Sequence, residues 1–161
     1  MGAKILVIDD DLALVRSLGR TFDFCGFETL NAPDGMMGVQ MALRHKPDLI
    51  LMELHFPSGG ALFVLKNLRQ SLITREIPIL IVTSSTDSEA KKRLLDFGIQ
   101  TYLQKPCDRG ELLAHILVQM GDLSSLSDAL PASAVVTTGD FPNSSTSSRP
   151  ATPNTSNRLT S

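Results

Sequence analysis

The chain has 161 residues, a formal net charge of −2 and 42% hydrophobic residues, which suits one soluble domain with an appendage. No apolar run approaches the roughly 18–20 residues that a membrane span requires, and the charge balance is not basic enough to indicate nucleic acid binding. The two cysteines, Cys25 and Cys107, show no spacing typical of a disulfide framework or a metal site, so we expect free thiols in the cytoplasm.

The first part of the chain predicts two strand–helix pairs. Residues 5–8 form an apolar run typical of a buried strand, and residues 11–24 follow with apolar side chains at a helical spacing. Asp11 is expected at the N-terminus of this helix, where its carboxylate complements the helix dipole. A weaker strand is predicted at residues 27–31, and Pro33 suits the first turn of a second helix.

The next part predicts three more pairs. Strands at residues 49–52, 77–82 and 100–103, the last of them weak, each precede a helical pattern. Gly98 suits a left-handed residue that ends the fourth helix. The apolar positions that mark these helices are Ala61, Val64, Leu65 and Leu68, then Ala90, Leu94 and Phe97, and finally Leu113, Ile116, Leu117 and Met120.

The order strand–helix therefore repeats five times. The strongest predicted strands do not alternate between apolar and polar residues, which is typical of parallel strands that helices cover on both faces. With short connections and right-handed crossovers, the pattern predicts a doubly wound α/β domain over residues 1–120. Polar sites in such domains lie at the carboxyl ends of the strands.

The composition changes sharply after residue 120. Ser, Thr, Pro and Asn dominate residues 121–161, and such a segment cannot bury enough apolar surface to offset its ordering entropy, so we predict a disordered tail. Within it, Leu123, Leu126 and Leu130 suit either a frayed extension of the last helix or a docking motif. We see no output domain in this sequence and expect any effect to be exerted through a partner.

Polar residues follow four of the predicted strands. They are Asp9, Asp10 and Asp11 after the first strand, Glu53 after the third, Thr83 and Ser84 after the fourth, and Lys105 after the fifth. Because the carboxyl ends of parallel strands meet at one edge of the sheet, we expect a single site. Clustered carboxylates require a cation or take up protons, and Mg²⁺ is a hard cation that suits their oxygens. A phosphoryl group bound there would also meet an ammonium and a hydroxyl.

Four segments resemble the receiver domains of bacterial two-component response regulators. They are residues 5–11 (ILVIDDD), 47–57 (PDLILMELHFP), 78–84 (PILIVTS) and 102–106 (YLQKP), and they occur in the family's order and spacing. The resemblance covers roughly residues 3–120. It implies a flavodoxin-like, five-stranded parallel sheet with strand order 2-1-3-4-5 and five helices.

The resemblance also implies a role for each residue of the site. A weakly bound Mg²⁺ would be held by Asp9, Asp10, Glu53 and the backbone carbonyl of His55. The switch and phosphoryl-binding residues would be Thr83, Ser84, Tyr102 and Lys105. On activation the threonine would shift and the tyrosine would turn inward with it. Such a domain is a signalling module and not an enzyme.

The resemblance further implies the kind of partner. A histidine kinase, a phosphotransferase or a downstream target protein would bind the surface formed by the fourth helix, the fifth strand and the fifth helix. A homodimer is a further option. Neither nucleic acid nor a membrane is expected as a partner, and we expect a bacterial, cytoplasmic, single-domain regulator.

Glu53 departs from the family, in which the phospho-acceptor is an aspartate. The extra methylene moves the carboxylate by about 1.5 Å, and a misplacement of 1 Å can lower a rate by about a hundredfold, so we predict a poor acceptor. Three interpretations stay open. Glu53 imitates a phosphorylated aspartate, or the switch is lost and the domain only docks, or the glutamate was introduced in the laboratory.

Two other classes of protein share parts of this pattern. A haloacid-dehalogenase-like phosphatase would use Asp9 and Asp11, but it wants Thr or Val where Ala13 lies and needs a later acidic motif, which we do not find before the tail. A flavodoxin-like cofactor binder needs a loop rich in Gly, Ser or Thr after the first strand, where three aspartates lie instead.

Overall fold

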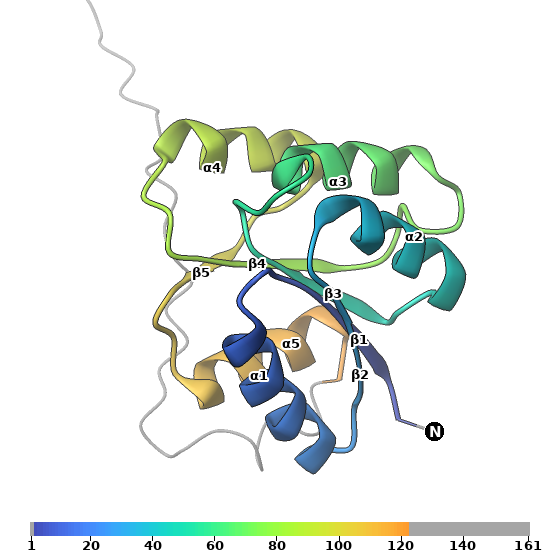
Figure 1. The fold of residues 1–161 in the computed structure, drawn as a ribbon, viewed down its shortest axis with the longest axis vertical. Helices are drawn as coiled ribbons and strands as arrows, with labels where there is room; N and C mark the ends of the chain where they lie inside the picture. Colours follow the sequence, from blue (N-terminus) through green and yellow to red (C-terminus); the bar gives the residue numbers. More distant parts are fainter. Residues whose placement is uncertain (1, 123–161) are drawn as a thin grey trace, which may run out of the picture.

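A five-stranded parallel sheet lies between two layers of helices, as Figure 1 shows for the computed structural model, which describes residues 2–122. The strands are β1 (Lys4–Ile8), β2 (Glu28–Ala32), β3 (Leu49–Met52), β4 (Ile79–Thr83) and β5 (Tyr102–Gln104). The helices are α1 (Leu12–Phe24), α2 (Gly35–His45), α3 (Gly60–Gln70), α4 (Ser88–Leu94) and α5 (Arg109–Gln119). The strand order β2-β1-β3-β4-β5 confirms the predicted fold class.

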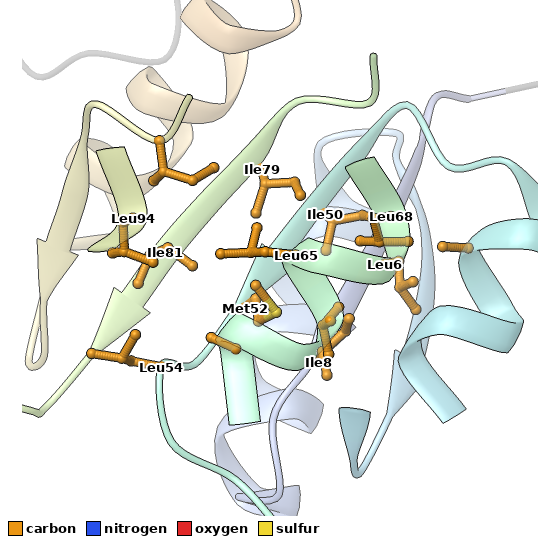
Figure 2. Close-up of a cluster of buried hydrophobic side chains, with 14 of the residues drawn as sticks. Leu6, Ile8, Ile50, Met52, Leu54, Leu65, Leu68, Ile79, Ile81 and Leu94 are labelled. Carbon is orange, nitrogen blue, oxygen red and sulfur yellow. The ribbon is translucent and has the colours of Figure 1, made fainter. Parts of the chain in front are cut away.

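Two hydrophobic clusters form on opposite faces of the sheet, because side chains alternate along each strand. From β1, Leu6 and Ile8 join the cluster under α2, α3 and α4, whereas Ile5 and Val7 join the cluster under α1 and α5. Figure 2 shows the first cluster, in which Leu65 of α3 lies among the side chains of the strands. Burial on both faces is the reason why β3 is apolar throughout and why β1 and β4 have a polar residue only at one end.

Aspartate side chains begin four of the five helices. Asp11, Asp34, Asp87 and Asp108 are N-caps, and their carboxylates accept hydrogen bonds of 2.8–3.2 Å from first-turn N–H groups. These bonds satisfy donors that no preceding carbonyl reaches. The cap role expected for Asp11 is confirmed. Pro33, in contrast, lies before the cap of α2 and not in its first turn, because Asp34 takes the cap position.

Three strands begin one or two residues later than predicted. The sheet pairs Lys4 with Glu28 and Ile81 with Tyr102, so β2 and β5 start where the neighbouring backbone offers a partner, whatever the side chains are. Gly98 ends the fourth helical segment with a φ of 77°, as predicted, but the turn before it, Leu95–Phe97, is a 3₁₀ helix.

Arg69 ties the end of α3 to the segments that lead into β4 and β5. Its Nη1 donates to the carbonyls of Arg75 at 2.8 Å and Ile77 at 3.0 Å, and its Nε donates to the carbonyl of Phe97 at 3.2 Å. One guanidinium thus holds two connections at the amino ends of these strands, opposite the edge where the polar residues gather.

No helix within residues 2–122 is long and apolar enough to cross a membrane. The predicted disordered tail, with Leu123, Leu126 and Leu130, lies outside the described residues, and the domain boundary at residue 120 stays a prediction.

Candidate functional site

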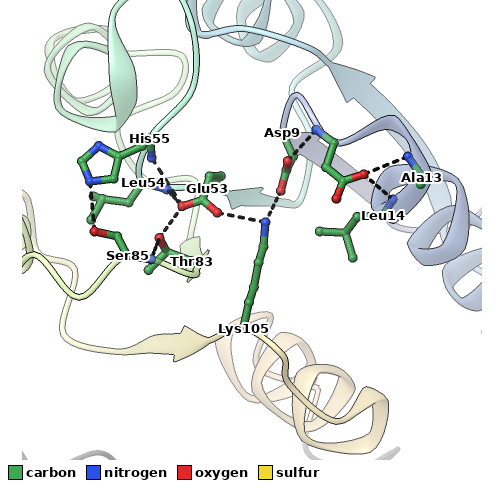
Figure 3. Close-up of polar contacts among 10 residues, drawn as sticks. Asp9, Ala13, Leu14, Glu53, Leu54, His55, Thr83, Ser85 and Lys105 are labelled. Atoms are coloured by element: carbon green, nitrogen blue, oxygen red, sulfur yellow. Dashed lines mark hydrogen bonds and ion pairs between the residues drawn. The ribbon is translucent and has the colours of Figure 1, made fainter.

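Four strands bring polar side chains to one cleft at the carboxyl edge of the sheet (Figure 3). The N–H groups of Asp9, Glu53 and Lys105 donate to carbonyls of neighbouring strands at 2.8–3.1 Å, which continues the ladder of the sheet one residue past each strand. The backbone of these three residues is therefore held by the sheet. The cleft measures about 670 Å³ and is lined by Asp9, Asp10, Asp11, Glu53, His55, Ser84, Ser85, Thr86 and Lys105.

Glu53 lies at the centre of the site, with only 6% of its surface exposed. Its Oε1 accepts hydrogen bonds from the N–H of Leu54 at 2.6 Å, from the N–H of His55 at 3.4 Å and from the hydroxyl of Thr83. Its Oε2 pairs with the Nζ of Lys105 at 2.9 Å. The glutamate carboxylate is thus held by a hydroxyl, an ammonium and two backbone amides (Figure 3).

Lys105 connects this carboxylate to the first strand. Its Nζ lies 2.7 Å from Asp9 Oδ2, and Asp9 Oδ1 accepts the N–H of Asp11 at 2.9 Å. Asp9 is 3% exposed, so two buried carboxylates share one ammonium. The positive charge offsets the repulsion that Asp9 and Glu53 would otherwise exert on each other.

The pKa values reflect this pairing. Burial raises the pKa of Glu53, but hydrogen bonds from Thr83, Lys105 and Leu54 together with the lysine charge outweigh burial and set the pKa below its ordinary value of 4.5. Burial lowers the pKa of Lys105, but its hydrogen bonds to Asp9 and Glu53, and their charges, raise the pKa above its ordinary value of 10.5. Both side chains are therefore charged at neutral pH.

The structure brings four of the predicted site residues into direct contact and places others at the rim. In contact, through the bonds above, are Asp9, Glu53, Thr83 and Lys105. Asp10 and Ser84 line the cleft as exposed residues. Their predicted roles in metal and phosphoryl binding stay predictions.

Tyr102, the predicted switch residue, packs against the hydrophobic cluster under α2, α3 and α4 and is partly buried. The Nζ of Lys91 in α4 lies 4.3 Å from the centre of the tyrosine ring and donates to the side chain of Gln104 at 3.1 Å. One lysine of α4 thus contacts two residues of β5, one of them through a cation–π interaction with the tyrosine ring.

The sequence did not reveal that the side chains of His55 and Ser85 meet. The His55 Nε2 lies 3.1 Å from the Ser85 Oγ, which joins the loop after β3 to the loop after β4 across the cleft. The N–H of Ser85 also donates to the Thr83 hydroxyl at 3.0 Å. We expected only the backbone carbonyl of His55 to matter. A usable signal was present, since both residues follow the ends of adjacent strands within three positions.

The predicted magnesium ligands are not arranged around a common point. The carboxylates of Asp9 and Glu53 both face the ammonium of Lys105, and their other oxygens accept protein N–H or O–H groups. Within the described part of the chain, no three acidic, histidine or cysteine side chains are gathered as metal ligands. In this arrangement the residues do not fit a Mg²⁺ ion that Asp9, Asp10 and Glu53 would coordinate together.

Asp11, which a haloacid-dehalogenase-like phosphatase would need beside Asp9, has another role. Its carboxylate accepts the N–H groups of Ala13 and Leu14, each at 3.0 Å, and so caps α1. This arrangement does not favour the phosphatase alternative.

The sequence matches the family described as response regulator receiver domain over residues 5–117, a range that includes the whole site. It is 30% identical over 136 residues to the DNA-binding dual master transcriptional regulator RpaA of Synechocystis sp., which covers 84% of this chain and 56% of that protein. It is also 30% identical over 152 residues to the phosphate regulon transcriptional regulatory protein PhoB of Klebsiella pneumoniae, and this match covers 88% of this chain and 66% of that protein. The chain thus spans between about half and two thirds of the length of these relatives.

Two solved structures share the fold with the same TM-score and the same sequence identity to this chain. The chemotaxis protein CheY4 of Vibrio cholerae matches with a TM-score of 0.69 and 25% identity, over 74% of this chain and 99% of that one. The receiver domain of the sensor histidine kinase PA1611 of Pseudomonas aeruginosa PAO1 matches with a TM-score of 0.69 and 25% identity, over 75% and 99%. That second structure holds a magnesium ion coordinated in its active site cleft.

Proposed function

Because this chain belongs to the response regulator receiver domain family, we propose that it is a receiver of two-component phosphorelay signalling that acts without phosphorylation at position 53. Glu53 occupies the phospho-acceptor position and biases the domain toward its active state, from which it signals through contacts with other proteins. The observation that carries the proposal is the position of the Glu53 carboxylate, which contacts both the Thr83 hydroxyl and the Lys105 ammonium.

The length of the side chain supports this reading. Thr83 and Lys105 are the groups that the family resemblance assigns to the phosphoryl group. Thr83 is the last residue of β4, and Lys105 directly follows β5. An aspartate at position 53 would carry its carboxylate about 1.5 Å less far from the backbone. Glu53 reaches into the space that the phosphoryl group of a phosphorylated aspartate would take.

The bias that Glu53 exerts is limited by chemistry. A carboxylate carries one negative charge and two oxygens, whereas a phosphoryl group carries about two charges and three terminal oxygens. A ligand shifts an equilibrium only by its different affinity for the two states. We therefore expect a partial shift toward the active state, smaller than phosphorylation of an aspartate would produce.

The proposed partner surface is formed by α4, β5 and α5. Lys91 of α4 contacts both Tyr102 and Gln104 of β5, so a change at the tyrosine alters this surface. The partner is a histidine kinase, a phosphotransferase, a downstream target or a second copy of the chain, in the cytoplasm. Any binding of Mg²⁺ is weak under this proposal and is limited to the exposed Asp10 and the His55 carbonyl, because Asp9 and Glu53 both pair with Lys105.

The test compares the unmodified chain with Glu53→Asp and Glu53→Gln. After incubation with Mg²⁺ and a small phosphoryl donor, intact mass should show one added phosphate on Glu53→Asp and none on the other two. Amide NMR spectra then give the state of the switch. The Thr83 and Tyr102 signals of the unmodified chain should lie between those of Glu53→Asp before and after phosphorylation, and Glu53→Gln should match the unphosphorylated form.

Two results would contradict the proposal. A phosphate on Glu53 itself would show that the position still accepts phosphate. Spectra of the unmodified chain that coincide with those of unphosphorylated Glu53→Asp would show that the glutamate exerts no bias, and the domain would then be a docking module without a switch.

A further inference from the structure

The buried acidic pair of the site is already neutralised by the protein. The Lys105 Nζ lies 2.7 Å from Asp9 Oδ2 and 2.9 Å from Glu53 Oε2, while the lysine side chain is only 20% exposed. The two remaining oxygens are bound as well, because Asp9 Oδ1 accepts the Asp11 N–H and Glu53 Oε1 accepts Leu54 N–H and the Thr83 hydroxyl. Each of the four carboxylate oxygens therefore has a protein donor.

A divalent cation would compete for the same oxygens. Mg²⁺ requires ligand oxygens at about 2.0–2.1 Å in octahedral geometry and gives up its water reluctantly. To bind two of these carboxylates it must displace the Lys105 ammonium from a contact that is largely shielded from water. Asp10 is the exposed acid beside this pair, and one exposed carboxylate holds Mg²⁺ only weakly.

We propose that the Lys105 ammonium takes the place of the divalent cation in this chain, so that Asp9, Glu53 and Thr83 stay assembled without Mg²⁺. This inference rests on the proposed function for the meaning of the assembled site, but its physical content is separate. It concerns which cation holds the carboxylates together.

Glu53 is the residue that allows the site to stay assembled without a metal ion. Its longer arm lets one carboxylate accept the Thr83 hydroxyl through Oε1 and meet Lys105 through Oε2. An aspartate at this position ends about 1.5 Å earlier, so it cannot keep both contacts. An oxygen freed from Thr83 becomes available to a metal ion beside Asp9 and Asp10.

The experiment measures cation binding by the full chain with Mn²⁺ as a paramagnetic substitute for Mg²⁺. The electron paramagnetic resonance signal of free Mn²⁺ gives the Kd, and thermal unfolding with and without MgCl₂ at matched ionic strength gives the effect on Tm. We expect Glu53→Asp to bind Mn²⁺ at least tenfold more tightly than the unmodified chain. We also expect Lys105→Met to bind it at least tenfold more tightly, to lower Tm without Mg²⁺ and to regain Tm when Mg²⁺ is added.

The matched control is Lys92→Met, which removes the same charge from an exposed residue of α4 that pairs with Glu89. It should leave the Mn²⁺ Kd unchanged. Equal tightening by Lys92→Met and Lys105→Met would overturn the proposal, since the effect would then be one of net charge. If Lys105→Met does not fold without Mg²⁺ and folds with it, that result supports the proposal directly.

The proposal is also overturned if the unmodified chain binds Mn²⁺ as tightly as Glu53→Asp, or if MgCl₂ raises its Tm by as much. This outcome differs from a failure of the proposed function. Suppose that the amide NMR spectra show no shift toward the active state but the unmodified chain binds Mn²⁺ weakly. The proposed function would then be wrong, whereas the proposal that Lys105 replaces the divalent cation would still hold.

Discussion

The side chain of Glu53 uses its hydrogen-bonding capacity inside the protein, since both oxygens are bound by donors from other parts of the site. These donors hold the Glu53 carboxylate in one position, and they favour its ionised form. The positions of the Thr83 hydroxyl and the Lys105 ammonium in turn depend on the negative charge of Glu53.

The lowered pKa of Glu53 predicts how stability depends on pH. Because the pKa is lower in the folded than in the unfolded state, ionised Glu53 stabilises the fold fully above its ordinary value of 4.5, and this contribution is lost as pH falls from there through the folded pKa. The free energy of unfolding should therefore exceed that of Glu53→Gln above pH 4.5, and the difference should shrink at lower pH. Urea denaturation of both proteins from pH 7 to pH 3 measures it, and a difference that stays constant would contradict the prediction.

Asp9, Glu53, Thr83 and Lys105 could be placed from the sequence, since each ends or follows a strand and parallel strands end at one edge. The contact between His55 and Ser85 was missed, although both residues follow adjacent strands, because the side chains meet through the course of two loops. The first of these loops includes Ser58 and Gly59 with φ of 58° and 109°, and hydrophobic periodicity carries no information on such a course. The sequence likewise could not predict that the Lys105 ammonium pairs with both Asp9 and Glu53.

At the scale of elements, the sequence predicted all five strands and five helices, and among the strands the starts of β4 and β5 were the least accurate boundaries, each two residues too early. Where a strand is buried on both faces, as in β3, the apolar run and the strand coincide. In β2 and β5 the side chains are partly exposed, and pairing with the neighbouring backbone sets the limits. The clamp by Arg69 was not predictable, because its acceptors are backbone carbonyls that any residue could supply.

Two glycines test how closely the helices pack. A Cβ on Gly35 of α2 would lie 2.9 Å from Phe56, from the Ser58 carbonyl and from Val64, so Gly35→Ala should lower the free energy of unfolding by about 1–3 kcal/mol. A Cβ on Gly19 of α1 would meet nothing within 4 Å, so Gly19→Ala should raise it by about 0.5–1 kcal/mol. Urea denaturation measures both, and a stabilising Gly35→Ala would show that the loop after β3 yields easily.

At the scale of the whole molecule, stability should be concentrated in the middle of the sheet. The described residues of β3 and β4 are buried throughout, whereas β5 is short and half exposed at one edge. In native-state hydrogen exchange, amides of β3 should exchange at least about a hundredfold more slowly than those of β5. Equal rates across the sheet would mean that the domain opens only as a unit, and the edge that carries Tyr102 would then not move independently.

The carboxylate of Glu53 is attached to the backbone through carbon–carbon bonds. A phosphorylated aspartate is instead an acyl phosphate, which water cleaves. Under the proposed function, the site contains no acyl phosphate, so neither water nor a phosphatase can end the signal by dephosphorylation. The strength of the output then follows the number of copies in the cell, and its duration follows synthesis, dilution and proteolysis. The output of such a domain therefore reports the concentration of the protein, whereas the output of a phosphorylated receiver also depends on the lifetime of its acyl phosphate.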